Sequence, residues 1–320
     1  MTQNFSIKDM ISHPGQRNAQ GDEWALFRTE FITDVMAQYH ALCLYRERHQ
    51  VRRIERSKSA TFPLIGGTKA TYLEAGAFIE GQKFQHSDVT ILLDNPTAAN
   101  VYLADFEEDM SPVDFRAHYS QEMGTALATM FDQNVARVAV QAAREKSYFV
   151  GGDGGSIIKG GKDVATDGEL IKNTLFKAME LFNYKKVPQT ERFCFVSPTT
   201  YAAAAATTDL INKNWGGEGS LAQGKLGTVA GITIISTINL PQGDQRADSD
   251  VLPRYRGDFS KTAFHLMHRD AVGTVMLKEM TTSIDWVPTN QSTLLTAKYM
   301  AGHGVLRPEC AIEVTTEEAA

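Results

Sequence analysis

Glycine-rich stretches are the first candidates for chemistry in this chain, because glycine loops can cradle phosphate groups. Residues 66–69 and 160–163 both lack the four-residue spacer and the Lys-Ser/Thr pair of a nucleotide-binding loop. Residues 151–155 lack the strand, the three spaced glycines and the helix of a dinucleotide fingerprint. We therefore interpret these glycines as turns and linkers that need positive φ angles.

Histidine, serine and acidic residues show no catalytic pattern either. His265 and His268 are three residues apart, without a third ligand or a glutamate in metalloprotease spacing. Ser111 and Ser197 each precede a proline, which favours helix caps over nucleophiles. An acidic cluster stands just before a predicted helix, where the helix dipole favours carboxylates: Asp105, Glu107, Glu108 and Asp109. The sequence predicts no catalytic, metal or cofactor site, and no enzyme.

The composition is that of an ordinary globular protein. Hydrophobic residues make up 42% of the 320 residues and charged residues 22%. The net charge of −6 disfavours a general nucleic-acid binder. Cys43, Cys194 and Cys310 are too far apart for a disulfide framework, which indicates reduced, buried thiols. With a polar N-terminus and no apolar run of ~20 residues, we expect a soluble protein made in a cytoplasm, with no membrane partner.

With no catalytic pattern, the first element that could carry a function is an extended segment. Residues 58–95 carry β-type patterning broken by glycines, which predicts a two-stranded ribbon. Such a ribbon is marginal alone, so we expect it to be buried against another molecule. The apolar residues expected to make that contact are Phe62, Leu64, Tyr72, Leu73 and Phe78.

A long helix follows the ribbon. Ser111, Pro112 at the first helical position and Asp114 together predict a capping-box start. Apolar residues then recur every three or four positions, which predicts a helix of roughly 30 residues, about 45 Å long. The buried stripe of this spine helix is predicted to contain Phe115, Tyr119, Leu127, Phe131 and Val135, together with Met123, Met130 and Val138.

A basic strip precedes the ribbon. Six basic residues against Glu47 and Glu55 give a local charge of about +4 in an acidic chain. This excess predicts a partner surface for a neighbouring subunit, an assembly factor or packaged nucleic acid, although a solvated face stays open. The strip consists of Arg46, Arg48, Arg52, Arg53, Arg56 and Lys58.

The flanking regions complete the predicted layout. Residues 1–22 form an arm, and a helix begins near Asp22. Residues 145–260 form an α/β region with helices starting near Asp167 and Ser197. Its strands are expected at 192–196 and 229–235, and residues 242–260 are expected to be a surface loop. Short strands at 263–267, 274–277 and 311–314 close the chain.

Four stretches of the sequence agree in order and spacing with one known family. They are residues 58–73, with Phe62-Pro63-Leu64-Ile65-Gly66-Gly67-Thr68, then Trp24-Ala25-Leu26-Phe27 with its helix, residues 268–275, which begin with His268-Arg269-Asp270-Ala271, and residues 297–308, with Ala297-Lys298-Tyr299-Met300 and Leu306-Arg307-Pro308. In these stretches the chain resembles the major capsid (coat) proteins of short-tailed, coliphage-like double-stranded-DNA bacteriophages. About half of the chain is covered, and residues 145–260 agree only in the order of their elements.

The resemblance implies an α+β, tailed-bacteriophage capsid fold. Its parts would be an N-terminal arm with the basic strip (1–57), an extended β-hairpin loop (58–95), a peripheral domain (96–145 and 262–320) and an axial domain (146–261). The chain would self-assemble into the hexamers and pentamers of an icosahedral head. Expected partners are a scaffolding protein, a portal protein at one vertex and packaged double-stranded DNA in weak, non-specific contact, with decoration proteins left open. Assembly would take place in the host bacterial cytoplasm.

Two alternatives stay open at this point. The first is the shell protein of a bacterial nanocompartment with the same fold, which a cargo enzyme carrying a hydrophobic tag would reveal. The second is an α/β enzyme with a site scattered through residues 150–260. A chain that stays monomeric and is stabilised by a ligand would favour this second interpretation.

Overall fold

The computed structural model describes residues 25–67, 72, 78, 81, 84–104, 115–207, 228–289 and 291–318. The chain divides into two compact units, each assembled from separate stretches of sequence. Unit 1 comprises Met1–Cys43, Asn95–Met130 and Lys278–Met300, and unit 2 comprises Leu44–Asp94, Phe131–Leu277 and Ala301–Ala320. Helices and strands occur together, which confirms the predicted α+β class.

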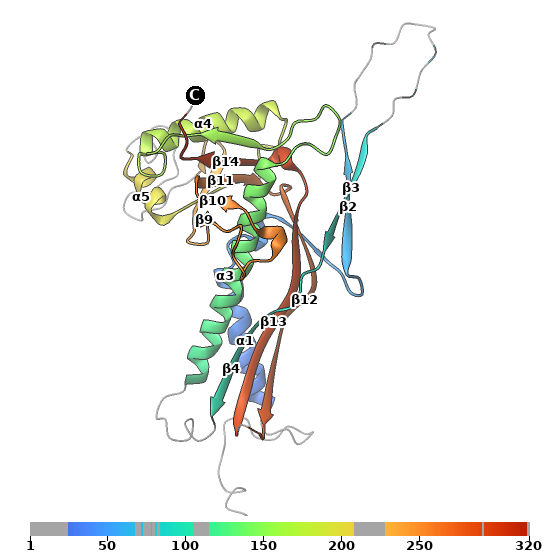
Figure 1. Cartoon of the computed structure of the whole chain (residues 1–320), viewed down its shortest axis with the longest axis vertical. Helices are drawn as coiled ribbons and strands as arrows, with labels where there is room; N and C mark the ends of the chain where they lie inside the picture. The colour runs from blue at the N-terminus through green and yellow to red at the C-terminus, as the bar shows by residue number, and fades with distance from the viewer. Residues whose placement is uncertain are drawn as a thin grey trace, which may run out of the picture. The chain divides into compact units, whose positions relative to one another are not determined.

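Helix α3, Phe115–Arg144, is the long helix that the apolar stripe predicted, and its length is 30 residues (Figure 1). Leu127, Phe131 and Val135 have at most 2% of their surface exposed. Tyr119 and Met130 differ from the prediction because 36% and 37% of their surfaces, respectively, are exposed. The predicted cap at residues 111–114 and the side chain of Phe115 lie outside the described residues.

Unit 1 contains α1 (Ala25–Leu42), which runs close to the first half of α3. A Cβ atom added at Gly124 would lie 2.9 Å from the carbonyl oxygen of Val35 and 3.0 Å from the Cβ of Gln38. Only glycine allows the two helices to approach so closely. Val35 and Tyr39 of α1 are buried on this side.

A four-stranded sheet has the order β1-β12-β13-β4. β1 (Gln50–Arg53) pairs in parallel with the start of β12 (Val272–Val287), and β4 (Thr97–Ala104) pairs antiparallel with β13 (Ser292–Val305). The sequence predicted only a short strand at 274–277. Beyond residue 276 most of the side chains of β12 are partly or fully exposed, so the apolar alternation that would reveal its full length is absent.

Unit 2 contains a mixed six-stranded sheet of order β5-β14-β11-β6-β8-β7. β11 is antiparallel to both of its neighbours, whereas β5 runs parallel to β14, and β6 runs parallel to β8. The strands are β5 (Ser156–Lys159), β6 (Arg192–Val196), β7 (Thr228–Val229), β8 (Ile232–Ser236), β11 (Thr262–His268) and β14 (Ala311–Thr315).

Two capped helices accompany this sheet, α4 (Gly168–Tyr184) and α5 (Pro198–Ala206). Asp167 caps α4 by accepting a hydrogen bond from the Glu169 N–H, and Ser197 caps α5 by accepting one from the Thr200 N–H. Ser197 is therefore a helix cap, as predicted. No helix among the described residues is long and apolar enough to span a bilayer.

The predicted surface loop at 242–260 is more ordered than expected. β9 (Gly243–Asp244) pairs antiparallel with β10 (Asp258–Phe259), and the short helix η5 (Pro253–Tyr255) lies between them. Two further short helices are η2 (Arg46–Arg48) and η6 (Pro308–Cys310). Elements of two or three residues carry too little periodicity to be predicted from sequence.

The extended segment forms an antiparallel ribbon of β2 (Ser59–Ile65) and β3 (His86–Leu92) (Figure 1). Its inner face packs on the chain itself, in a cluster with Val275 and Leu306. The ribbon residues that share this cluster are Ala60, Phe62, Val89 and Ile91. The root of the ribbon is thus buried without any partner, which the sequence did not predict.

Candidate functional site

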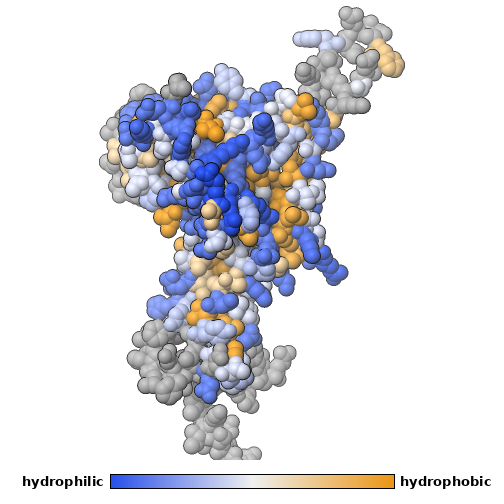
Figure 2. All heavy atoms as spheres, in the orientation of Figure 1, coloured by the Kyte–Doolittle hydropathy of each residue, from blue (hydrophilic) through white to orange (hydrophobic). Residues whose placement is uncertain are grey.

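The upper part of the ribbon exposes apolar side chains that its own chain does not cover. Ile65 is 56% exposed and Phe84 is 52% exposed, whereas Tyr72 and Phe78 are almost fully exposed. The ladder continues here through a bond from the Gly66 N–H to the Gln85 carbonyl (2.8 Å). Figure 2 shows apolar surface along the β2–β3 side of unit 2. An exposed apolar group of this kind is typical of a protein–protein contact.

The five predicted contact residues of the ribbon fall into two groups. Tyr72 and Phe78 are exposed, as a contact with another molecule requires. Phe62 is half-buried in the chain's own cluster, and Leu64 is only 6% exposed, so the chain itself already covers part of Phe62 and most of Leu64. Leu73 lies outside the described residues.

Ile65 and Phe84 also belong to this surface, although neither was predicted as a contact residue. In β2 the burial alternates, so that Leu64 faces the core and Ile65 faces away from it. Strict alternation along the strand is the sequence signal that separates these two neighbours. Val150, which is 90% exposed, adds a further apolar residue beside the ribbon, because its carbonyl accepts a bond from Gln85 Nε2 (3.3 Å).

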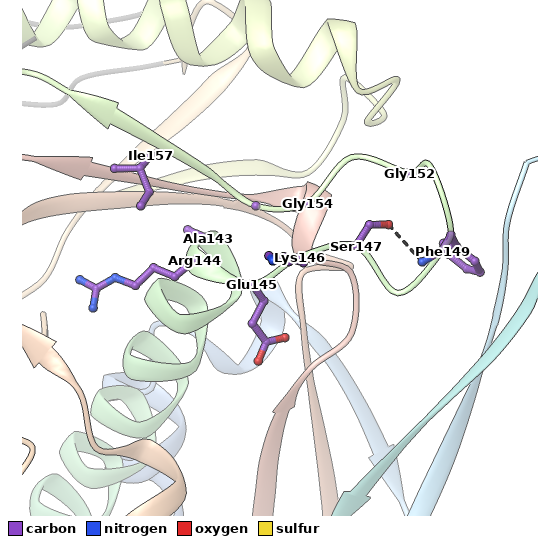
Figure 3. Close-up of a pocket in the computed structure, with 10 residues that line it drawn as sticks. Ala143, Arg144, Glu145, Lys146, Ser147, Phe149, Gly152, Gly154 and Ile157 are labelled. Atoms are coloured by element: carbon purple, nitrogen blue, oxygen red, sulfur yellow. Dashed lines mark hydrogen bonds between the residues drawn. The ribbon is translucent and has the colours of Figure 1, made fainter. Parts of the chain in front are cut away.

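The loop after α3 supports the ribbon from one side and borders a shallow hollow of about 550 Å³. A Cβ atom at Gly66 would lie 3.0 Å from the ring of Phe149, so the ribbon and this loop touch. Figure 3 shows the hollow, with the Ser147 hydroxyl accepting a bond from the Phe149 N–H. Its charged lining residues are Arg144, Glu145 and Lys146. Two of them are engaged within the chain, since Arg144 donates to Glu313 and Glu145 accepts a hydrogen bond from the Tyr148 hydroxyl.

The arginines of the basic strip differ in their contacts and in their exposure. Arg48 donates to the Leu44 carbonyl and lies over the Phe193 ring, while Arg52 donates to the Thr61 carbonyl (2.7 Å) and lies over Phe62. Arg46 and Arg48 are half-buried, whereas Arg52, Arg53 and Arg56 are exposed. Arg52 is thus exposed but also supports the ribbon root through its two contacts.

Buried histidines form part of the internal support of unit 2. His49 Nε2 and His303 Nδ1 both lie 2.7 Å from the hydroxyl of Thr274. Burial lowers the pKa of His49 to about 4 and that of His265 to about 3, and the pKa of His303 is lowered as well. These rings are therefore neutral at pH 7. Among the described residues, no group of three or more potential ligands is placed to hold a metal ion.

Asp132 of α3 fixes the chain where it leaves α1. Its carboxylate accepts hydrogen bonds from the backbone N–H groups of Leu44 (2.8 Å) and Tyr45 (3.3 Å), and Asn239 approaches it at 3.5 Å. Burial raises the pKa of Asp132 to about 6, although these hydrogen bonds oppose the rise. No sequence pattern signals this role, since the residue sits within an otherwise apolar helix face.

Comparison with known proteins agrees with a capsid fold. The family described as Gp10A-like major capsid protein matches residues 61–315. The chain is 29% identical to the major capsid protein of Escherichia phage T7 over 318 residues, which cover 92% of each chain. It is 28% identical to that of Enterobacteria phage T3 in an alignment 329 residues long that covers 94% of each chain.

Solved structures point the same way. The capsid structure of the Cyanophage P-SCSP1u superimposes with a TM-score of 0.77 and 32% identity, covering 87% of this chain and 89% of that one. The mature capsid of bacteriophage PhiM1 gives a TM-score of 0.70 at 17% identity, covering 85% and 86%, and so supports the fold. These proteins are structural and not enzymes, and neither alternative function gains support. Because the family match spans well over half of its residues, the chain belongs to the Gp10A-like family of major capsid proteins.

Proposed function

We propose that this major capsid protein assembles as hexamers and pentamers of an icosahedral head, and that the upper β2–β3 ribbon makes the principal contact with the adjacent subunit. One observation carries the proposal. The root of the ribbon is buried on its own chain, whereas the apolar side chains above it are not: Ile65, Phe84, Tyr72 and Phe78. Laid over a neighbour, these side chains would be removed from water, which stabilises the pair.

The proposal includes the partners implied by such a head. A scaffolding protein would guide assembly in the host bacterial cytoplasm, a portal would occupy one vertex, and double-stranded DNA would fill the interior in weak, non-specific contact. The division into an arm (1–57), a ribbon (58–95), a peripheral domain (96–145 and 262–320) and an axial domain (146–261) belongs to the same proposal. The exposed arginines of the basic strip are proposed to meet acidic groups of a neighbour or of the scaffold.

Shortening the ribbon above its root tests this function. Residues 67–84 are replaced by an Asn-Gly turn, which leaves the paired ladder from Ser59–Leu92 to Ile65–His86 intact. We expect a folded subunit with unchanged circular dichroism that forms no shells. Normal shells from the shortened chain would show that the ribbon does not make the principal contact.

Two neighbouring residues on opposite faces of β2 give a matched pair of point variants. Ile65→Asp changes an exposed residue and should leave the melting temperature almost unchanged while lowering the yield of shells. Leu64→Asp places a carboxylate in the buried root and should destabilise the subunit by roughly several kcal/mol. Equal effects of the two variants on stability would contradict the assignment of the two faces.

A further inference from the structure

The backbone makes three hydrogen bonds at the point where β3 ends, of which the first continues the ladder of the ribbon and the other two connect it to β13 and to Arg254. The Leu93 N–H donates to the Lys58 carbonyl (2.9 Å), and the Asp94 N–H donates to the Ala301 carbonyl (3.2 Å). The carbonyl of Leu92 accepts a hydrogen bond from Arg254 Nη1 (2.9 Å). The backbone also passes very close to β13, because a Cβ at Gly302 would lie 2.1 Å from the Leu92 carbonyl oxygen. Only glycine permits this approach.

The short helix η5 supplies two side chains to this point. Arg254 forms a salt bridge with the Asp94 carboxylate, and the Tyr255 hydroxyl donates to the same carboxylate at 2.5 Å. The Tyr255 hydroxyl also accepts a hydrogen bond from the His303 N–H (3.0 Å). Tyr255 is 1% exposed and the Asp94 side chain is 11% exposed, whereas the Arg254 side chain, at 31%, reaches solvent. The charge-assisted bond from Tyr255 to Asp94 therefore has little competition from water, which makes it strong and directional.

The same short helix is tied to α3. Gln141 Nε2 donates to the carbonyls of Arg254 and Arg256, at 3.2 Å in both cases. Gln141 thus links α3 to the residues that bind Leu92 and Asp94. The described structure therefore contains a continuous chain of contacts from the long helix through η5 to the ribbon root.

We propose that Gln141, Arg254 and Tyr255 are positioning residues for assembly, which fix the direction of the ribbon through Asp94 and couple that direction to α3. This inference rests on the proposed role of the ribbon as the contact with a neighbouring subunit. The seven-residue strand β2, measured from its first residue at the root to Ile65, spans roughly 20 Å. A small rotation at the root therefore displaces the contact residues far enough to miss their place on a neighbour.

A distance measurement on free subunits tests the positioning directly. Spin labels are attached at Gly81→Cys, on the ribbon, and at Lys177→Cys, on the exposed face of α4 in the same compact unit. The native Cys43, Cys194 and Cys310 are buried, so the introduced thiols are labelled selectively. In the otherwise wild-type protein we expect a narrower distance distribution than in Arg254→Gln, together with a severalfold higher yield of shells.

Matched variants separate positioning from general stability. Arg246→Gln removes exposed ion pairs with Asp244 and Asp258 in the same segment and should change neither the distance distribution nor the yield of shells. Arg254→Lys keeps the charge facing Asp94 and should restore part of the narrow distance distribution and part of the shell yield. Gln141→Leu, which keeps every charge, should also broaden the distance distribution. It replaces Arg254→Gln in the test if that variant does not fold.

The outcomes are distinct. The proposal would be overturned if Arg254→Gln and Gln141→Leu gave the same distance distribution and the same shell yield as Arg246→Gln. If the wild-type protein forms no shells, the proposed function fails, while the label distances in free subunits still decide whether Arg254 and Gln141 fix the ribbon.

Discussion

Asp132 and the buried histidines of unit 2 respond to pH in opposite directions. The pKa of Asp132 is raised by burial, so its contribution to stability is fully present below its ordinary value near 4 and is lost as the pH rises through about 6. The pKa values of His49, His265 and His303 are lowered, so their contribution is lost as the pH falls below their ordinary value near 6.5. Because these contributions overlap in pH, the contribution of one group is measured by comparing the wild-type protein with a variant that lacks that group.

Asp132→Asn removes the titration of this carboxyl group. Between pH 4 and pH 7, we expect the wild-type free energy of unfolding to fall by up to about 3 kcal/mol relative to the variant, since a pKa moved from near 4 to about 6 corresponds to that amount. Arg48 lies near the carboxylate and works against the rise. Urea unfolding of both proteins across this pH range provides the measurement. Parallel curves would show that Asp132 does not titrate in this window.

The stripe of α3 makes a second prediction at the scale of single residues. Leu127→Asp or Val135→Asp places an unpaired carboxylate at a site with at most 2% exposure, and should destabilise the subunit by roughly several kcal/mol. A protein stable by about 5–15 kcal/mol would become largely insoluble. Met130→Asp is the matched control because Met130, on the same helix, is 37% exposed. Soluble, normally melting Leu127→Asp protein would contradict the burial of the stripe.

At the scale of elements, we expect the exposed arginines of the basic strip to play two different roles. Arg53→Glu with Arg56→Glu reverses two exposed charges and should leave the fold intact, because surface pairs contribute ~0–1 kcal/mol each. Because the contact is repeated around a shell, the same change should weaken assembly. Salt beyond the physiological range should likewise slow the assembly of the wild-type protein. Light scattering during assembly follows both effects.

Arg52→Glu is the comparison for this strip. It removes the hydrogen bond to the Thr61 carbonyl and the contact with Phe62, so it should lower both the melting temperature and the yield of assembled shells. If empty shells of the Arg53/Arg56 variant form normally and only packaging falls, the strip meets nucleic acid instead. If assembly and packaging are both normal, the strip is a solvated face.

The elements that could be predicted are those with a long, regular pattern. The 30-residue α3, the cap at Ser197 and the ribbon strands follow from apolar spacing and from turn or cap residues. The full length of β12 and β13, and the short β9, β10 and η5, could not be predicted, because their burial depends on partners distant in sequence. The same holds for the ribbon root, where Val275 and Leu306 cover Ala60 and Ile91.

At the scale of the whole molecule, membership of the family has a direct physical meaning. A major capsid protein forms the shell of the virion, so its subunits associate with one another in capsomers. The described structure is in keeping with such an assembly, because its ribbon is buried at the root and apolar above it. Contacts of this type become strong when they are repeated in a closed, symmetric arrangement.

Electron microscopy of the full chain, expressed with a scaffolding protein and purified, is the decisive experiment for assembly through the ribbon. We predict closed shells of uniform size, with density for the ribbon of each subunit lying over its neighbour and with Tyr72 and Phe78 in the contact. Sedimentation of the same sample should show a single large species. A sample that contains only monomers or dimers at high concentration, or shells in which the ribbons touch no neighbour, would contradict this mode of assembly.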